Sequence, residues 1–202
     1  MADRTMQLIR KLLLFLKPVQ IWIQGLGHVE SGFTKEYIDY LLMTIKPGDI
    51  LGSYESGRFT SWFIKGDFDH IAIVNNDLYV VEAVGDDFVK DRNGNLVNKG
   101  GVRKVKLEEW LWKKTHVFVV RHYMEHVALA ASIECNKFVG KNYDYSFDNH
   151  NETFYCSEIP YASMKPFFES IFENVPKNKA ILPIDYLTEY YLIPIANSRT
   201  KE

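Results

Sequence analysis

The sequence predicts one α+β domain in which helices at both ends of the chain pack against an antiparallel sheet. Its 202 residues suffice for one domain with its own core, and 47% hydrophobic with 25% charged residues is typical of soluble globular proteins. Short β-forming runs separated by turn residues fill the middle of the chain. Apolar residues at helical spacing return after residue 125, which completes the helix–sheet–helix order.

The N-terminal part, residues 1–44, has a helical pattern interrupted at Gly25-Leu26-Gly27. A second helix is predicted from Thr34 to Met43, with Thr34 as a plausible start. The apolar run Leu12–Leu16 is flanked by basic residues and ends before Pro18, so it does not have the form of a secretory signal. It favours a helix that docks on its own domain or on a partner, with peripheral contact to a membrane as the alternative.

Five short strands are predicted after the turn residues Pro47-Gly48-Asp49. They are Ile50–Tyr54, His70–Val74, Leu78–Val84, Val102–Lys106 and His116–Arg121. The turn residues Asn75-Asn76-Asp77 and Asn93-Gly94-Asn95 lie between them, and Leu107–Lys113 is predicted as a short helix before the last strand.

A longer helix is predicted over Glu125–Val139, with Gly140 as its C-terminal stop. Cys135 falls on the apolar stripe of this helix. Because an apolar environment raises the pKa of a thiol and keeps it unreactive, Cys135 is interpreted as a core residue.

The composition excludes several classes of function. A formal net charge of −2 does not favour nucleic-acid binding. Two cysteines form neither a disulfide framework nor a Cys-rich zinc site, and no Gly-rich phosphate loop is present, so no metal or cofactor is expected. No apolar stretch reaches the ~18 residues of a membrane-spanning helix, so a soluble or peripheral protein is expected.

The hairpin around Asn75-Asn76-Asp77 predicts a pair of chemically useful side chains. If these three residues are the loop, Val74 pairs with Leu78 and His70 lies directly opposite Glu82 on the same face. A carboxylate there can fix the imidazole tautomer and leave the other ring nitrogen to act as a base. The alternative is an ordinary cross-strand ion pair, although Glu82 lies among apolar residues, where a charge needs a partner.

Cys156 is the candidate nucleophile. Pro160 is tolerated in a first helical turn, so a helix is predicted to begin close to Cys156. The free N–H groups of such a helix start lower the pKa of a thiol and can hold an oxyanion. From the pattern alone, a second buried cysteine is an equal alternative.

An ordered set of short motifs resembles the permuted papain-like cysteine hydrolases of the NlpC superfamily, in particular the YiiX/YebB-like branch. The motifs are Pro47-Gly48-Asp49-Ile50-Leu51, Asp69-His70-Ile71-Ala72-Ile73-Val74, Val81-Glu82-Ala83, Gly140-Lys141-Asn142-Tyr143-Asp144-Tyr145 and Phe154-Tyr155-Cys156-Ser157-Glu158. A weaker similarity lies at Leu182-Pro183-Ile184-Asp185-Tyr186. The resemblance implies a permuted papain-like fold for residues 47–202, a central sheet or half-barrel packed against helices, preceded by an N-terminal helical extension, residues 1–46.

The resemblance also implies site roles. Cys156 would be the nucleophile, His70 the general base and acid, and Glu82 the residue that orients the imidazole. Tyr143 and Ser157 would line the substrate or oxyanion site.

The implied activity is thiol-dependent cleavage, or acyl transfer, at an amide or ester bond through a thioester. The substrate would be a cell-wall peptide or an acyl lipid, and the aromatic residues Phe59, Trp62, Phe63 and Phe68 favour a lipid chain if they do not belong to the core. The alternative is a papain-like module that binds or assembles without cleaving, for example within an envelope or virion complex.

Overall fold

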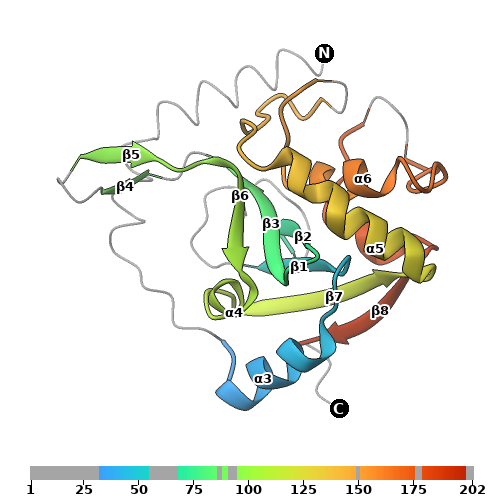
Figure 1. Ribbon diagram of the computed structural model, residues 1–202, viewed down its shortest axis with the longest axis horizontal. Helices are drawn as coiled ribbons and strands as arrows, with labels where there is room; N and C mark the ends of the chain where they lie inside the picture. The colour runs from blue at the N-terminus through green and yellow to red at the C-terminus, as the bar shows by residue number, and fades with distance from the viewer. Residues whose placement is uncertain are drawn as a thin grey trace.

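A computed structural model describes residues 32–54, 68–85, 88–90, 95–148, 151–175 and 179–198 and confirms the α+β class. Its centre is a six-stranded antiparallel sheet with the strand order β6-β3-β2-β1-β7-β8 (Figure 1). The strands are β1 (Ile50–Tyr54), β2 (His70–Val74), β3 (Tyr79–Val84), β6 (Gly101–Lys106), β7 (His116–His122) and β8 (Leu192–Asn197). A separate pair is formed by β4 (Phe88–Lys90) and β5 (Leu96–Asn98).

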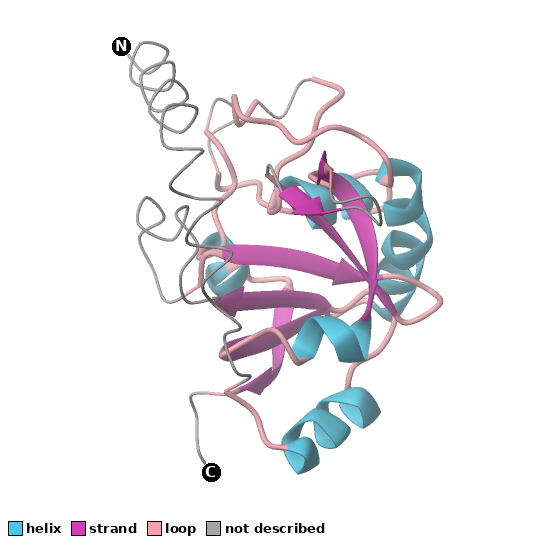
Figure 2. Cartoon of the chain, turned by 90° about the vertical axis from the view of Figure 1, so that its left-hand side faces the viewer, coloured by secondary structure: helices cyan, strands magenta, loops and turns pink. Residues whose placement is uncertain are grey.

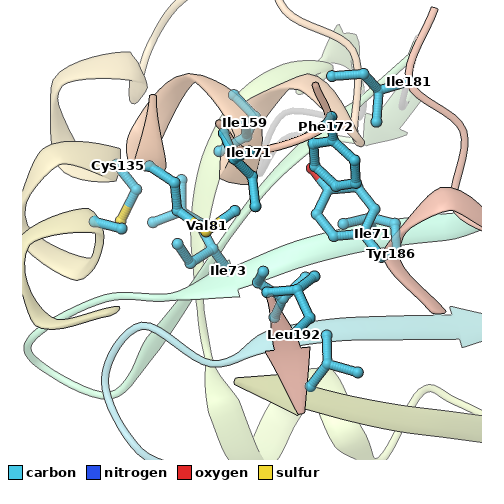
Figure 3. Packing of buried hydrophobic residues seen from close by; sticks show 14 of the residues in the cluster. Ile71, Ile73, Val81, Cys135, Ile159, Ile171, Phe172, Ile181, Tyr186 and Leu192 are labelled. Atoms are coloured by element: carbon cyan, nitrogen blue, oxygen red, sulfur yellow. The ribbon is translucent and has the colours of Figure 1, made fainter. Parts of the chain in front are cut away.

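Helices cover both faces of the sheet (Figure 2). On one face lie α5 (Glu125–Glu134), a 3₁₀ turn (Cys135–Phe138) and α6 (Glu158–Met164), packed on a core that includes Ile71 and Ile73 (Figure 3). On the other lie α3 (Lys35–Thr44) and α4 (Leu107–Leu111). The short α7 (Asp185–Thr188) precedes β8. Because side chains alternate along a strand, each central strand contributes to both cores.

Most predicted elements are present with shifted ends. β1 and β2 have the predicted bounds, β3 begins one residue later, and β7 extends to His122. Helix α3 begins after Thr34, whose hydroxyl accepts from the Tyr37 N–H at 3.3 Å. Helix α5 ends at Glu134 rather than Val139, because the chain tightens into a 3₁₀ turn before Gly140 takes a φ of 89°.

The Pro47-Gly48-Asp49 turn joins the layers. Gly48 has a φ of 85°, and a Cβ there would lie 2.1 Å from the Ala128 carbonyl oxygen, so glycine is needed. The fully buried Asp49 carboxylate accepts from Arg121 Nε at 2.5 Å and Nη2 at 2.7 Å. This pair connects the start of β1 to β7.

The edge strand β8 and the short helix α7 were not predicted. β8 contains Pro194, which lacks an amide hydrogen and is tolerated at a sheet edge. The Asn93-Gly94 turn and the segment Leu12–Leu16 lie outside the described residues. Within the described ranges, no helix combines the length and apolar character needed to cross a bilayer.

Candidate active site

His70 and Glu82 form a buried pair between β2 and β3. His70 Nε2 lies 2.8 Å from Glu82 Oε2, and the two residues are only 3% and 1% exposed. The structure therefore brings the predicted imidazole and carboxylate into hydrogen-bonding contact.

The predicted register of this hairpin is wrong by two residues. Val74 pairs with Val80 rather than Leu78, and Ile73 pairs with Val81, so His70 does not lie directly opposite Glu82. The loop begins one residue later because Asn75 pairs with Tyr79 and its Oδ1 accepts from two backbone N–H groups, those of Asp77 at 3.0 Å and Tyr79 at 2.8 Å. Leu78 closes the loop with a φ of 58°. A shift of two preserves the side-chain face, so long side chains still meet diagonally.

The pairing between β2 and β3 stops before it reaches His70 and Glu82. Ile73↔Val81 and Val74↔Val80 are the paired residues of these strands. Beyond them the strands are connected through the His70 and Glu82 side chains. Alternation from Val80 places Glu82 on the face that carries α4.

Glu82 accepts two further hydrogen bonds that sequence reasoning missed. Trp110 Nε1 in α4 donates to Oε2 at 2.8 Å, and Arg103 Nε in β6 donates to Oε1 at 3.0 Å. The buried Lys114 ammonium lies 4.6 Å from the centre of the Trp110 ring. Arg103 could have been found from the sequence only through the register of β3 and β6, which places it opposite Glu82. That register was not predicted.

Cys156 approaches His70 and Glu82 from the face of the sheet that carries α5 and α6. It lies two residues beyond Phe154, which forms a bridge with Tyr143, and two residues before Glu158, the first residue of α6. Helix α6 contacts β2 and β3, and Ile159 packs in the core shared with Ile71. The thiol lies close enough to the His70 ring for the two groups to shift each other's pKa. Because Nε2 faces Glu82, Nδ1 is the nitrogen left for the sulfur.

The three groups shift one another's pKa values. Burial alone would raise the pKa of Cys156, but the hydrogen bond from His70 and its positive charge outweigh burial and lower that pKa. Burial would lower the pKa of His70, yet its bonds to Cys156 and Glu82 raise it. Burial likewise opposes ionisation of Glu82, but His70, Lys114 and Arg103 hold its pKa well below the usual value.

The predicted helix start lies close to Cys156. Helix α6 has seven residues and begins at Glu158, so Cys156 precedes it, with Ser157 as the N-cap. After burial, the largest influence on the Cys156 pKa is the imidazole. The lowered pKa of Cys156 therefore depends, after burial, first on a contact with His70, a residue distant in the chain.

Of the remaining predicted residues, Ser157 has a contact to the sulfur. Ser157 Oγ is 3.8 Å from Cys156 Sγ. Tyr143 is half-buried and packs its ring against Tyr145, with centroids 4.9 Å apart. Phe68 belongs to the core, edge-on to Phe118 at 4.3 Å. Phe59, Trp62 and Phe63 lie outside the described residues.

Cys135 behaves as predicted for a core thiol. It is fully buried in the core beneath α5, and burial raises its pKa to about 12. The two cysteines are both free, but only Cys156 has a lowered pKa.

Comparison with known proteins gives one family and one fold. The family model described as permuted papain-like amidase enzyme, YaeF/YiiX, C92 family matches residues 44–167, more than half of the chain. A solved structure described as metalloprotein yiiX from Escherichia coli O157:H7 superposes with a TM-score of 0.56 at 17% identity, covering 77% of this chain and 98% of that one. No curated protein sequence matches this chain.

The E. coli protein is described as a metalloprotein. Within the described ranges, no three His, Cys, Asp or Glu side chains come together as a metal-binding group.

Proposed function

Because this chain belongs to the permuted papain-like amidase family of the YaeF/YiiX type, we propose that it cleaves an amide or ester bond with Cys156 as nucleophile. The observation that carries this proposal is the buried His70–Glu82 hydrogen bond of 2.8 Å together with the coupling of His70 to Cys156, which lowers the pKa of the thiol and raises that of the imidazole. A buried cysteine with a purely structural role has the opposite shift, as Cys135 does.

In the proposed reaction, His70 holds the proton that Cys156 gives up. The thiolate attacks the carbonyl carbon, and the carbonyl oxygen becomes an oxyanion. When the tetrahedral intermediate collapses, the bond to the leaving amine or alcohol breaks and His70 returns the proton to it, leaving a thioester on Cys156. Water then gives a proton to His70 and attacks the thioester, which releases the acid and restores the thiolate.

Glu82 stays ionised throughout these steps. Its bonds from Trp110 and Arg103 lower its basicity, so it orients the His70 ring and stabilises the imidazolium without taking the proton. In this proposal, Ser157, with its hydroxyl beside the sulfur, helps to hold the oxyanion, and Tyr143 lines the approach of the substrate.

The proposed substrate is a cell-wall peptide or an acyl lipid, cleaved by the domain that comprises residues 47–202. Incubation of the protein with murein and, separately, with acyl lipids distinguishes the two. Cleavage of a peptide bond in murein would release new amino groups, whereas cleavage of an acyl lipid would release fatty acids. Transfer of the acyl group to an added amine instead of water would identify an acyltransferase.

The nucleophile is tested by labelling with a thiol-directed acyl probe followed by peptide mass analysis. We expect labelling on Cys156 in the wild-type protein and in Cys135→Ala, none in Cys156→Ser, and at least a 10²-fold lower rate in His70→Ala. Cys135→Ala is the matched control because it removes the other thiol. Equal labelling of wild type and both site variants would contradict the proposal and favour a papain-like module that binds without cleaving.

A further inference from the structure

Two buried tyrosines attach the residues on either side of Cys156 to the C-terminal part of the chain. The Tyr186 hydroxyl in α7 donates to the carbonyl oxygen of Ser157. The Tyr155 hydroxyl accepts from the Ile181 N–H at 2.9 Å. Tyr155 is 2% exposed and Tyr186 is fully buried. The residue before the nucleophile and the residue after it are therefore both bound to residues 181–186.

This segment is anchored independently of Cys156. The Tyr186 ring packs edge-on against Phe172, with centroids 4.7 Å apart (Figure 3). Asp185 Oδ2 accepts from the Leu182 N–H at 2.7 Å, and β8, which follows α7, pairs with β7. Because Tyr186 is fixed by these contacts, its hydroxyl can orient the Ser157 peptide.

Ser157 is in direct contact with the sulfur. Ser157 follows Cys156, is the N-cap of α6, and has its hydroxyl 3.8 Å from Sγ. A displacement of residue 157 would be passed through the backbone to the adjacent Cys156, and would move the sulfur relative to the His70 ring. After burial, the hydrogen bond to that ring has the largest effect on the Cys156 pKa, so the alignment matters for reactivity.

We infer that Tyr186 is a positioning residue for Cys156 and that residues 179–198, beyond the family match at 44–167, take part in the function of the site. The inference rests on the proposed function, in which Cys156 reacts as a thiolate. Tyr186 acts through Ser157, and Tyr155 fixes the preceding residue to the same segment.

The test measures the rate of Cys156 alkylation by iodoacetamide against pH in the full chain, with peptide mass analysis to separate Cys156 from Cys135. Tyr186→Phe keeps the ring and removes the hydroxyl. We expect the thiol pKa to rise by about one unit, so that alkylation below both pKa values slows about tenfold. The matched control is Ser163→Ala, which removes a buried hydroxyl that donates to the Ile159 carbonyl at 2.7 Å in the same helix. It should keep the wild-type pH profile.

The outcomes are distinct. If Tyr186→Phe loses thermal stability but keeps the wild-type pH profile, its role is only structural and the inference is overturned. If that variant does not fold, Tyr155→Phe takes its place, and an unchanged profile there overturns the inference equally. An ordinary thiol profile in the wild-type protein would instead refute the proposed function, and the positioning role with it.

Discussion

At the scale of single residues, Glu82 is the most heavily bonded acceptor of the candidate site. Its two oxygens form hydrogen bonds with His70, Trp110 and Arg103, although Glu82 is only 1% exposed. A buried carboxylate is expensive unless donors replace its hydration, and three donors from three different elements do so here. The same donors fix the direction in which the carboxylate faces the imidazole.

Removal of the indole donor tests this view of Glu82. Trp110→Phe keeps most of the ring volume but deletes the N–H bonded to Oε2, so we expect about 1.5–3 kcal/mol lower free energy of unfolding in urea. Without the indole N–H, less of the negative charge on Glu82 is neutralised by other donors. The carboxylate should then stabilise the protonated His70 ring more strongly. The pKa of His70, followed by NMR titration of its ring, should rise on the order of half a unit.

The control for that variant is Trp112→Phe. Trp112 lies just after the same helix and is 39% exposed, so its replacement should change the free energy of unfolding by less than about 0.5 kcal/mol. An unchanged His70 titration in Trp110→Phe would show that the indole has no electrostatic influence on the pair.

At the scale of elements, close approach of side chains to backbone determines how the sheet packs. Gly52 in β1 pairs with Phe118 in β7, and the Phe118 ring lies over the backbone of β1. The Phe118 ring also packs edge-on against Phe68, two residues before His70. The strand that carries His70 is thus held through a contact that only glycine permits at residue 52.

Gly52→Ala should therefore destabilise the sheet. The new Cβ would lie 1.7 Å from Phe118 Cε1, so the ring has to move, and we expect the free energy of unfolding in urea to fall by about 1–3 kcal/mol. Gly85→Ala is the control, because its Cβ would meet Tyr145 Oη at an ordinary 3.7 Å. Equal stability of the two variants would mean that Phe118 relaxes without cost.

Much of the element scale was predictable from sequence. The bounds of β1 and β2 follow from runs of β-forming residues, and the helix over residues 125–134 follows from apolar spacing. The β2–β3 register was not predictable from turn composition, because the Asn75 side chain starts the loop one residue later. The edge strand β8 was missed because a strand with Pro194 resembles a loop in sequence.

At the scale of the whole molecule, the stability of the fold should depend on the protonation of Glu158. This residue lies two positions after Cys156 and is 3% exposed, and burial, reinforced by the charges of Asp144 and Asp148, raises its pKa to about 8. The folded chain thus binds a proton that the unfolded chain releases near its ordinary pKa of 4.5. Stability should fall as pH rises from 4.5 to about 8 and then level off.

Glu158→Gln should abolish this dependence. We expect the variant to match the wild-type protein near pH 4.5 and to exceed its free energy of unfolding at pH 9, with ~1.4 kcal/mol for each unit by which the pKa is shifted. Urea unfolding at both values of pH measures it, with the exposed Glu173→Gln as control. If the difference in stability between the wild-type protein and Glu158→Gln were the same at pH 9 as near pH 4.5, Glu158 would not be a buried acid that is neutral in the folded protein.

The sequence by itself determined the class of fold, the strands and helices that carry the site, and the shared face of His70 and Glu82. These depend on local patterns, because side-chain direction alternates along a strand whatever its partners are. The tertiary structure alone decided that Cys156 meets the imidazole where β2 and β3 separate, and that Trp110, Arg103 and Tyr186 support the three groups. Such contacts join residues distant in the chain, so they depend on how whole elements pack and leave no periodic signal in the sequence.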